Sequence, residues 1–200
     1  GLVGSEMCIR DRFNADGSEA NNCVNGLRCV AFLYDLKNTY IQIKSRRFLV
    51  NKTSNGATVK GELPKVEKIR DYFVIKFGNN HIAKSCENID GFKLQEEYEK
   101  IKTSKPYNEI KDFNMSVFKI CEDIIKIRTY ENGTGETLSC GSATISVAYA
   151  LSKELNSNEL KISSRGGNTI VRILNDGVIS DASAEIIREG FLNGWTKKIS

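Results

Sequence analysis

One short pattern occurs twice in the chain at a constant spacing, and it constrains the fold more than any other feature. Glu19-x-x-x-Cys23 recurs 117 residues later as Glu136-x-x-x-Cys140. A unit that occurs twice, with one cysteine in each copy, predicts two similar halves whose thiols face each other across a shared site. Two opposed thiols suit a reaction in which one removes a proton from a carbon and the other delivers one. The repeat therefore favours racemisation or epimerisation.

A helical pattern follows each cysteine. The apolar residues of segments 27–34 and 144–151 are spaced i, i+3, i+4, i+7, which is one face of a helix. Asn25 and Ser142 stand just before these stripes, and both are residue types favoured as N-caps. We therefore expect both cysteines at or just before a helix N-terminus.

Alternating strand patterns follow both helices, at residues 41–46 and 160–165. A third helix is expected over residues 94–103, ending before Pro106. Four further strands are expected at residues 73–77, 124–130, 169–173 and 186–191. Strands around one helix in each half predict an α+β fold made of two similar units.

Composition and spacing exclude several classes of function. The 29 basic and 25 acidic residues give a net charge of +4 without a basic stripe, so we expect no nucleic-acid partner. No apolar run is long enough to span a bilayer, so no membrane role is expected. Six cysteines without CxxC spacing, and a single histidine, predict no metal site. Reduced thiols without a secretory signal indicate a cytoplasmic protein.

Residues 1–11 resemble translated sequencing-adapter read-through. We interpret them as a non-native segment, carrying Cys8, and expect the genuine protein to begin near Arg12. The remaining unpaired cysteines, Cys29, Cys86 and Cys121, have no counterpart in the other half, so we assign them to packing.

The chemistry of helix N-termini suits the two repeated cysteines. A thiol has a reference pKa of about 8.5, which a helix N-terminus can lower to roughly 3.5–7.5, so that a thiolate base exists near neutral pH. The same N-terminus presents free backbone N–H groups and a positive dipole end to a substrate carboxylate. Two such termini on opposite sides of one carbon would provide base, acid and anion site together, and no pyridoxal cofactor is required.

Both cysteine motifs resemble the signatures of diaminopimelate epimerase. The first runs from Phe13-Asn14-Ala15 to Cys23-Val24-Asn25-Gly26, and the second from Arg128 to Cys140-Gly141-Ser142. Between and after them, three shorter stretches are similar to family motifs: Gly78-Asn79-Asn80-His81, Phe113-Asn114-Met115-Ser116 and Ala182-Ser183-Ala184-Glu185. The resemblance covers about residues 12–190.

The resemblance implies a cofactor-independent isomerase of lysine and peptidoglycan biosynthesis that interconverts LL- and meso-diaminopimelate. Cys23 and Cys140 would be the acid/base pair, with roles that exchange according to substrate stereochemistry. The other implied site residues bind substrate or support the site. They are Asn14, Asn79 and Asn114 for its polar ends, Glu131 for its amino group, the backbone of Val24, Asn25, Gly141 and Ser142 for its carboxylate, Asn132, and His81 as a supporting residue.

The resemblance also implies an architecture. Two pseudo-symmetric, barrel-like domains would each surround a central helix, with the first domain incomplete and the protein a homodimer. Residues 12–64, completed by 187–200, would form the N-terminal domain, and residues 65–186 the C-terminal domain.

Two positions depart from the family pattern, and two alternatives stay open. Asn132 stands where the family has an arginine that would pair with the substrate's distal carboxylate, and Val24 stands where a glycine is usual. Asn132 favours a related two-thiol racemase of another amino acid, such as a histidine or proline-type substrate. A catalytically inactive homologue that retains the fold is the other alternative.

Overall fold

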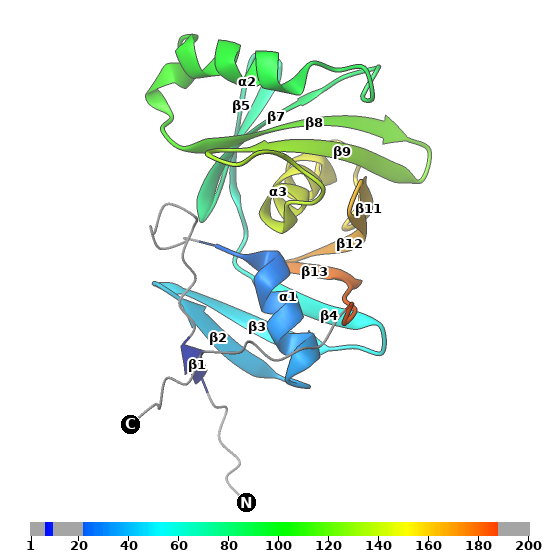
Figure 1. Cartoon of the computed structure of the whole chain (residues 1–200). Helices are drawn as coiled ribbons and strands as arrows, with labels where there is room; N and C mark the ends of the chain where they lie inside the picture. The colour runs from blue at the N-terminus through cyan, green and yellow to red at the C-terminus, as the bar shows by residue number, and fades with distance from the viewer. Residues whose placement is uncertain (1–6, 10–21, 188–200) are drawn as a thin grey trace, which may run out of the picture.

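The computed structural model describes residues 7–9 and 22–187, and it is a sheet-rich α+β structure (Figure 1). Its helices are α1 (Val24–Leu33), α2 (Leu94–Thr103) and α3 (Gly141–Ser152), with a short 3-10 turn at Tyr107–Glu109. The first seven strands are β1 (Met7–Ile9), β2 (Thr39–Ile43), β3 (Arg46–Lys52), β4 (Gly56–Gly61), β5 (Lys65–Ile69), β6 (Tyr72–Phe77) and β7 (Asn79–Ser85). The other six are β8 (Phe113–Cys121), β9 (Ile124–Glu131), β10 (Gly135–Thr137), β11 (Glu159–Ser164), β12 (Gly167–Leu174) and β13 (Gly177–Ser183).

All thirteen strands of the described residues belong to one hydrogen-bonded sheet. Its order is β1-β2-β3-β4-β13-β12-β11-β9-β8-β7-β6-β5, and β10 pairs with β9. The pairs β1–β2, β7–β8 and β9–β11 are parallel and the rest antiparallel. Strands β4 and β13 join the strands around α1 to those around α3, with Val178 opposite Gly61 and Ser183 opposite Gly56.

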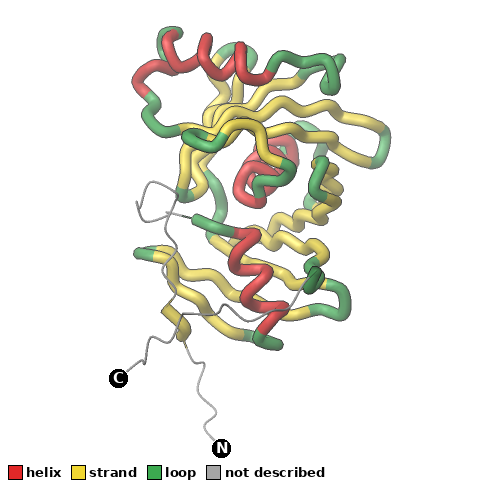
Figure 2. Tube along the Cα trace, in the orientation of Figure 1, coloured by secondary structure: helices red, strands yellow, loops and turns green. Residues whose placement is uncertain are grey.

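One hydrophobic core contains both α1 and α3. Leu27 and Ala31 of α1 and Ile145 and Leu151 of α3 belong to a single cluster of buried residues. Helix α1 packs on β3 and β4, whereas α3 lies inside the curled sheet against β6–β8 and β11–β13 (Figure 2). Residues 141–148 are all buried, as expected for a helix surrounded by strands.

Helix α2 covers the outer face of the sheet and has a separate core. Its buried residues Leu94, Tyr98 and Ile101 pack with Phe113 and Met115 of β8. The three buried residues of α2 recur at i, i+4 and i+7, so they form one apolar face that packs on this surface of the sheet.

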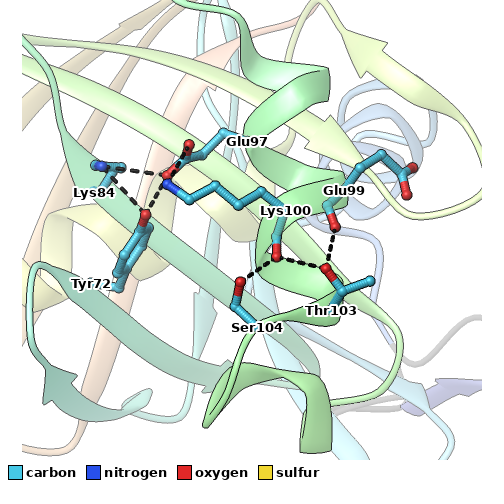
Figure 3. Close-up of polar contacts among 7 residues, drawn as sticks. All are labelled: Tyr72, Lys84, Glu97, Glu99, Lys100, Thr103 and Ser104. Carbon is cyan, nitrogen blue, oxygen red and sulfur yellow. Dashed lines mark hydrogen bonds and ion pairs between the residues drawn. The ribbon is translucent and has the colours of Figure 1, made fainter.

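A polar cluster ties α2 to the sheet (Figure 3). The Tyr72 hydroxyl donates to Glu97 Oε1, and Lys84 Nζ lies 3.3 Å from the Tyr72 hydroxyl and 3.4 Å from Glu97 Oε1. Lys100 adds an ion pair to the other oxygen of Glu97, at 3.4 Å. Burial raises the pKa of Tyr72, and so does its hydrogen bond to Glu97.

Most expected elements are confirmed, with three corrections. The helices after Cys23 and Cys140 and the helix at Leu94–Thr103 are present. However, the N-caps are Cys23 and Cys140 themselves, so Asn25 and Ser142 lie inside the first turns. Ile186 and Ile187 are not in a strand, and the rest of that expected strand lies outside the described residues. Several strands were not expected, among them β4 and β13, which pair with each other over a long distance in the sequence.

Two further observations concern segments singled out in the sequence. Met7–Ile9, within the segment interpreted as non-native, pairs its backbone with β2, and that interpretation stays a prediction. Among the described residues, no helix is long and apolar enough to cross a membrane.

Candidate active site

Cys23 begins helix α1. Its Sγ accepts the backbone N–H of Gly26 at 3.2 Å, and its carbonyl accepts the N–H of Leu27 at 2.9 Å. The thiol therefore satisfies one of the donors that a helix leaves free in its first turn. A Cβ at Gly26 would lie 2.7 Å from Cys23 Sγ, so a glycine is needed for this close approach.

Cys140 begins helix α3 in the matching position but is buried. Its Sγ lies 3.5 Å from Ser142 Oγ, and its carbonyl accepts from the backbone and hydroxyl of Thr144, both at 3.0 Å. Burial, and to a smaller extent the nearby Glu131 carboxylate, raise the pKa of the Cys140 thiol to about 12. The Ser142 hydroxyl and the Ala143 N–H oppose this change. The expectation that the helix N-terminus makes Cys140 a thiolate is therefore wrong, because desolvation outweighs the helix.

The N-termini of α1 and α3 touch. Asn25 Nδ2 donates to the carbonyl of Ser139, the residue before Cys140, at 3.2 Å. A Cβ at Gly141 would lie 2.6 Å from Asn25 Oδ1 and 2.9 Å from Val24 Cβ, so the two first turns are in close contact. The first turns of α1 and α3, which each begin at a cysteine, are therefore in contact. Figure 1 shows α3 directly above α1.

Curated relatives of this chain are diaminopimelate epimerases. The diaminopimelate epimerase of Nitrosomonas europaea is 30% identical over 191 residues, which cover 80% of this chain and 68% of that protein. The chain belongs to the diaminopimelate epimerase family. Diaminopimelate epimerase of Flavobacterium psychrophilum is 31% identical and that of Buchnera aphidicola 28%; the alignments cover 78% of this chain and 64% of each relative. The chain thus spans just under two thirds of these two relatives. No protein-family model matches it.

Solved structures place the fold with the same group. A phenazine biosynthesis protein of the PhzF family from Enterococcus faecalis has a TM-score of 0.65 at 17% identity, covering 92% of this chain and 78% of that one. A predicted epimerase from Pseudomonas aeruginosa has a TM-score of 0.56 at 13% identity, covering 94% and 82%. At these identities the likeness establishes only that this chain shares its fold with these proteins.

Two of the residues that the family resemblance implies lie on the face of the sheet that covers α3. Asn114 on β8 and His81 on β7 are opposite each other in the parallel ladder, and both are buried. Burial lowers the pKa of His81 to about 3, so its imidazole is neutral. Asn114 Oδ1 accepts the backbone N–H of Asn132 at 3.0 Å. Asn79 begins β7 and is half-buried, and Asn14 lies outside the described residues.

Glu131 is the last residue of β9 and Asn132 follows it, and their side chains contact different neighbours. Glu131 Oε1 accepts the hydroxyl of Thr137 at 2.6 Å and is close enough to Cys140 to influence its pKa. Asn132 is exposed, and its amide is engaged by two neighbours: the Tyr98 hydroxyl donates to Oδ1 at 2.7 Å, and Nδ2 donates to Asp112 at 3.2 Å. The position where the family resemblance implies an arginine thus contributes to contacts with α2 through Tyr98.

The repeated glutamate and the remaining cysteines have structural surroundings. Glu136 forms an ion pair with Arg128 at 2.7 Å and another with Arg165 at 3.2 Å; its counterpart Glu19 is outside the described residues. Cys86 and Cys121 are half-buried, but Cys29 is exposed, so its assignment to packing is wrong. Within residues 7–9 and 22–187, no cluster of three or more His, Cys, Asp or Glu side chains could hold a metal.

Sequence reasoning missed two residues that bear on the site. Ser139 contributes its carbonyl to the contact with Asn25, and a backbone acceptor leaves no sequence signal. Arg28 is buried on α1, where its Nη1 donates to Asn25 Oδ1 at 2.8 Å. An arginine directly after Leu27, in the helical stripe that enters the core, was the available signal.

Proposed function

We propose that this chain is a cofactor-independent epimerase that interconverts LL- and meso-diaminopimelate by proton transfer at the α-carbon, in lysine and peptidoglycan biosynthesis. The observation that carries the proposal is the contact between two helix N-termini that each begin at a cysteine, through Asn25 and Ser139. Membership of the diaminopimelate epimerase family supports the substrate.

The reacting carboxylate would bind between the two first turns. The backbone N–H groups of Val24 and Asn25 in α1, and of Gly141 and Ser142 in α3, belong to the initial residues that have no acceptor within their own helix. Both helix dipoles place their positive ends at this point, which favours a carboxylate and stabilises the extra charge that it takes on when the proton leaves.

Cys140 and Cys23 would exchange one proton each with the substrate. Burial raises the pKa of the Cys140 thiol to about 12, which favours the direction of reaction in which Cys140 is the proton donor and Cys23 is the base. The Cys23 thiolate takes the α-proton and becomes a thiol, while Cys140 gives its proton to the opposite face of the carbon and becomes a thiolate. The substrate of opposite configuration reverses both roles. Glu131 favours the protonated form of Cys140, and it would also take the substrate amino group.

Asn132 supports a second candidate, a two-thiol racemase of another amino acid. Its amide is neutral and is held by Tyr98 and Asp112, so it offers no cation to a distal carboxylate. A substrate without that carboxylate, such as histidine or a proline-type amino acid, would not need one. A chain that binds ligand without catalysis is the third candidate.

A substrate panel in deuterated water separates these candidates. Exchange of the α-hydrogen of diaminopimelate, followed by NMR, supports the first; exchange confined to another amino acid supports the second. Cys23→Ala and Cys140→Ala should each abolish exchange. The control is Cys29→Ala, which changes an exposed cysteine of α1 and should leave the exchange rate unaltered. Ligand binding by the wild type without exchange of any substrate would exclude both catalytic proposals.

We also propose the finer architecture, two pseudo-symmetric units with one central helix each. The packing of α1 on β3 and β4, and of α3 on β6–β8 and β11–β13, supports it. Limited proteolysis near the exposed Glu62, between β4 and β5, should release fragments that correspond to the two units. Cleavage that spreads evenly over the chain would contradict the two-unit arrangement.

A further inference from the structure

Arg28 is a buried cation that donates into the first turn of its own helix. It is 5% exposed; Nη1 donates to Asn25 Oδ1 at 2.8 Å, and Nη2 donates to Ser180 Oγ on β13 at 2.7 Å. A guanidinium stays protonated in proteins, so both contacts are charge-assisted. Among the described residues no carboxylate lies within ion-pair distance of Arg28, and its hydrogen bonds there are to neutral acceptors.

Asn25 passes this contact on to the second helix. With its Oδ1 accepting from Arg28, the amide presents Nδ2 to the carbonyl of Ser139, to which it donates at 3.2 Å. The same Oδ1 faces Gly141, since a Cβ there would lie 2.6 Å away. Arg28 therefore determines which end of the Asn25 amide faces the carbonyl of Ser139.

Loss of Arg28 would remove that constraint. A free Asn25 amide can rotate or flip, and a flipped amide would turn its oxygen toward the Ser139 carbonyl, which also accepts and cannot donate. The hydrogen bond between the two cysteine-bearing turns would then be lost, although neither cysteine had been altered.

We propose that Arg28 is a positioning residue that acts through Asn25 and holds the N-termini of α1 and α3 at the separation that the substrate carboxylate requires. This inference rests on the proposed function, because it assigns the carboxylate to the gap between those two turns. It adds a residue that touches neither the substrate nor a catalytic sulfur.

Kinetics of α-hydrogen exchange test the functional part. Arg28→Met keeps much of the side-chain length without the donors, and it should raise KM about tenfold with a smaller change in kcat, as expected for the loss of a charge-assisted hydrogen bond. Arg28→Lys, which can reach Asn25 with one ammonium, should restore part of the affinity. Ser180→Ala, which removes the other partner of Arg28, should leave KM within about twofold. A KM equal to that of the wild type in Arg28→Met would overturn the proposal.

Hydrogen exchange of side-chain amides gives a test that needs no activity. Asn22, three residues before Asn25, is an internal control. Its Nδ2 donates to the carbonyl of Phe77 at 2.9 Å, and the hydrogen bonds of Arg28 in the described residues go to Asn25 and Ser180 instead. In Arg28→Met, the Asn25 amide protons should exchange about tenfold faster, and those of Asn22 at the wild-type rate. Equal acceleration of both amides, or of neither, would overturn the positioning role.

The two measurements distinguish a failure of the proposed function from a failure of the role proposed for Arg28. A wild-type protein that exchanges no substrate would refute the proposed function but leave the amide result intact. An active protein whose Asn25 amide ignores Arg28 would refute this inference alone. If Arg28→Met does not fold, Arg28→Lys takes the same two measurements, with changes of about threefold expected and unchanged values contradicting the role.

Discussion

The side chain of Asn25 donates to the backbone carbonyl of Ser139 at 3.2 Å, and the two residues are 114 positions apart in the chain. This hydrogen bond joins the turn that begins with Cys23 to the residue that precedes Cys140. Close packing accompanies it, because Gly141 faces Asn25 and Val24. Small changes at this contact should therefore affect catalysis more than their effect on stability would suggest.

Gly141→Ala tests that expectation. The added Cβ would lie 2.6 Å from Asn25 Oδ1 and 2.9 Å from Val24 Cβ, so the turns must separate. Overpacking of this kind costs about 1–3 kcal/mol of unfolding free energy, and the rate of α-hydrogen exchange should fall at least about tenfold. Ser146→Ala in the same helix is the matched control, because its buried hydroxyl has no hydrogen-bond partner in the described part of the chain and its loss should cost less than about 0.5 kcal/mol. Full activity of Gly141→Ala would show that the contact is not needed.

The raised pKa of Cys140 predicts an alkaline loss of stability. The unfolded thiol ionises near pH 8.5, whereas the folded thiol stays protonated to about pH 12, so the unfolded state binds fewer protons in this window. The unfolding free energy should therefore fall as pH rises above 8.5, by at most about 1.4 kcal/mol per pH unit. Urea titrations of the wild type and Cys140→Ala at pH 8 and 10.5 measure it. Parallel declines in the two proteins would contradict the raised pKa.

The lowered pKa of His81 predicts a loss of stability at acidic pH. The unfolded imidazole takes a proton near pH 6.5, but burial keeps the folded imidazole neutral to about pH 3. Stability contributed by this difference is present above pH 6.5 and is lost as pH falls toward 3. His81→Gln, which retains polarity but does not titrate, should flatten the decline between pH 6.5 and 4.5. An unchanged slope in chemical denaturation over that range would exclude His81 as its source.

Glu97 should make α2 docking dependent on pH. Burial alone raises the pKa of Glu97, but the Tyr72 hydroxyl, Lys84 and Lys100 more than offset it, and the net change is downward. A lowered folded pKa stabilises the protein above the unfolded value of about 4.3 and less as pH falls through the folded value. Glu97→Gln should therefore cost roughly 1 kcal/mol at pH 7, after allowance for solvent screening, and about nothing at pH 3.

Tyr72→Phe is the companion variant for that cluster. It removes the hydroxyl that donates to Glu97 and leaves the ring, which packs against Tyr107 with 5.0 Å between ring centroids. The loss at pH 7 should be similar to that of Glu97→Gln, and the double variant should lose less than the sum of both. Additive losses in thermal or urea unfolding would show that the two groups act independently.

The parts of the fold that depend on local patterns could be predicted from the sequence. The stripes after Cys23 and Cys140 correctly indicated α1 and α3, and Leu94, Tyr98 and Ile101 indicated α2, because helix periodicity is a property of one segment. The pairing of β13 with β4 involves segments more than a hundred residues apart, and no local pattern encodes it.

The positions of the two cysteines were more predictable from the sequence than their physical chemistry. The repeat indicated that Cys23 and Cys140 begin equivalent helices, and they do. The pKa of Cys140 depends on how completely the folded sheet excludes water from α3, which the motif does not contain. Arg28 was missed for the same reason, since its acceptor Ser180 reaches it only through tertiary structure.

The pairing of β4 with β13 limits how the molecule can admit a ligand. Backbone pairing of β4 with β13 joins the strands around α1 to those around α3, from Val178 opposite Gly61 to Ser183 opposite Gly56. Moving the two cysteine-bearing helices directly apart would break the β4–β13 pairing. Each buried backbone group left unpaired would cost free energy. We therefore expect any separation of the two helices to occur by twisting of the β4–β13 pair, with its backbone hydrogen bonds retained.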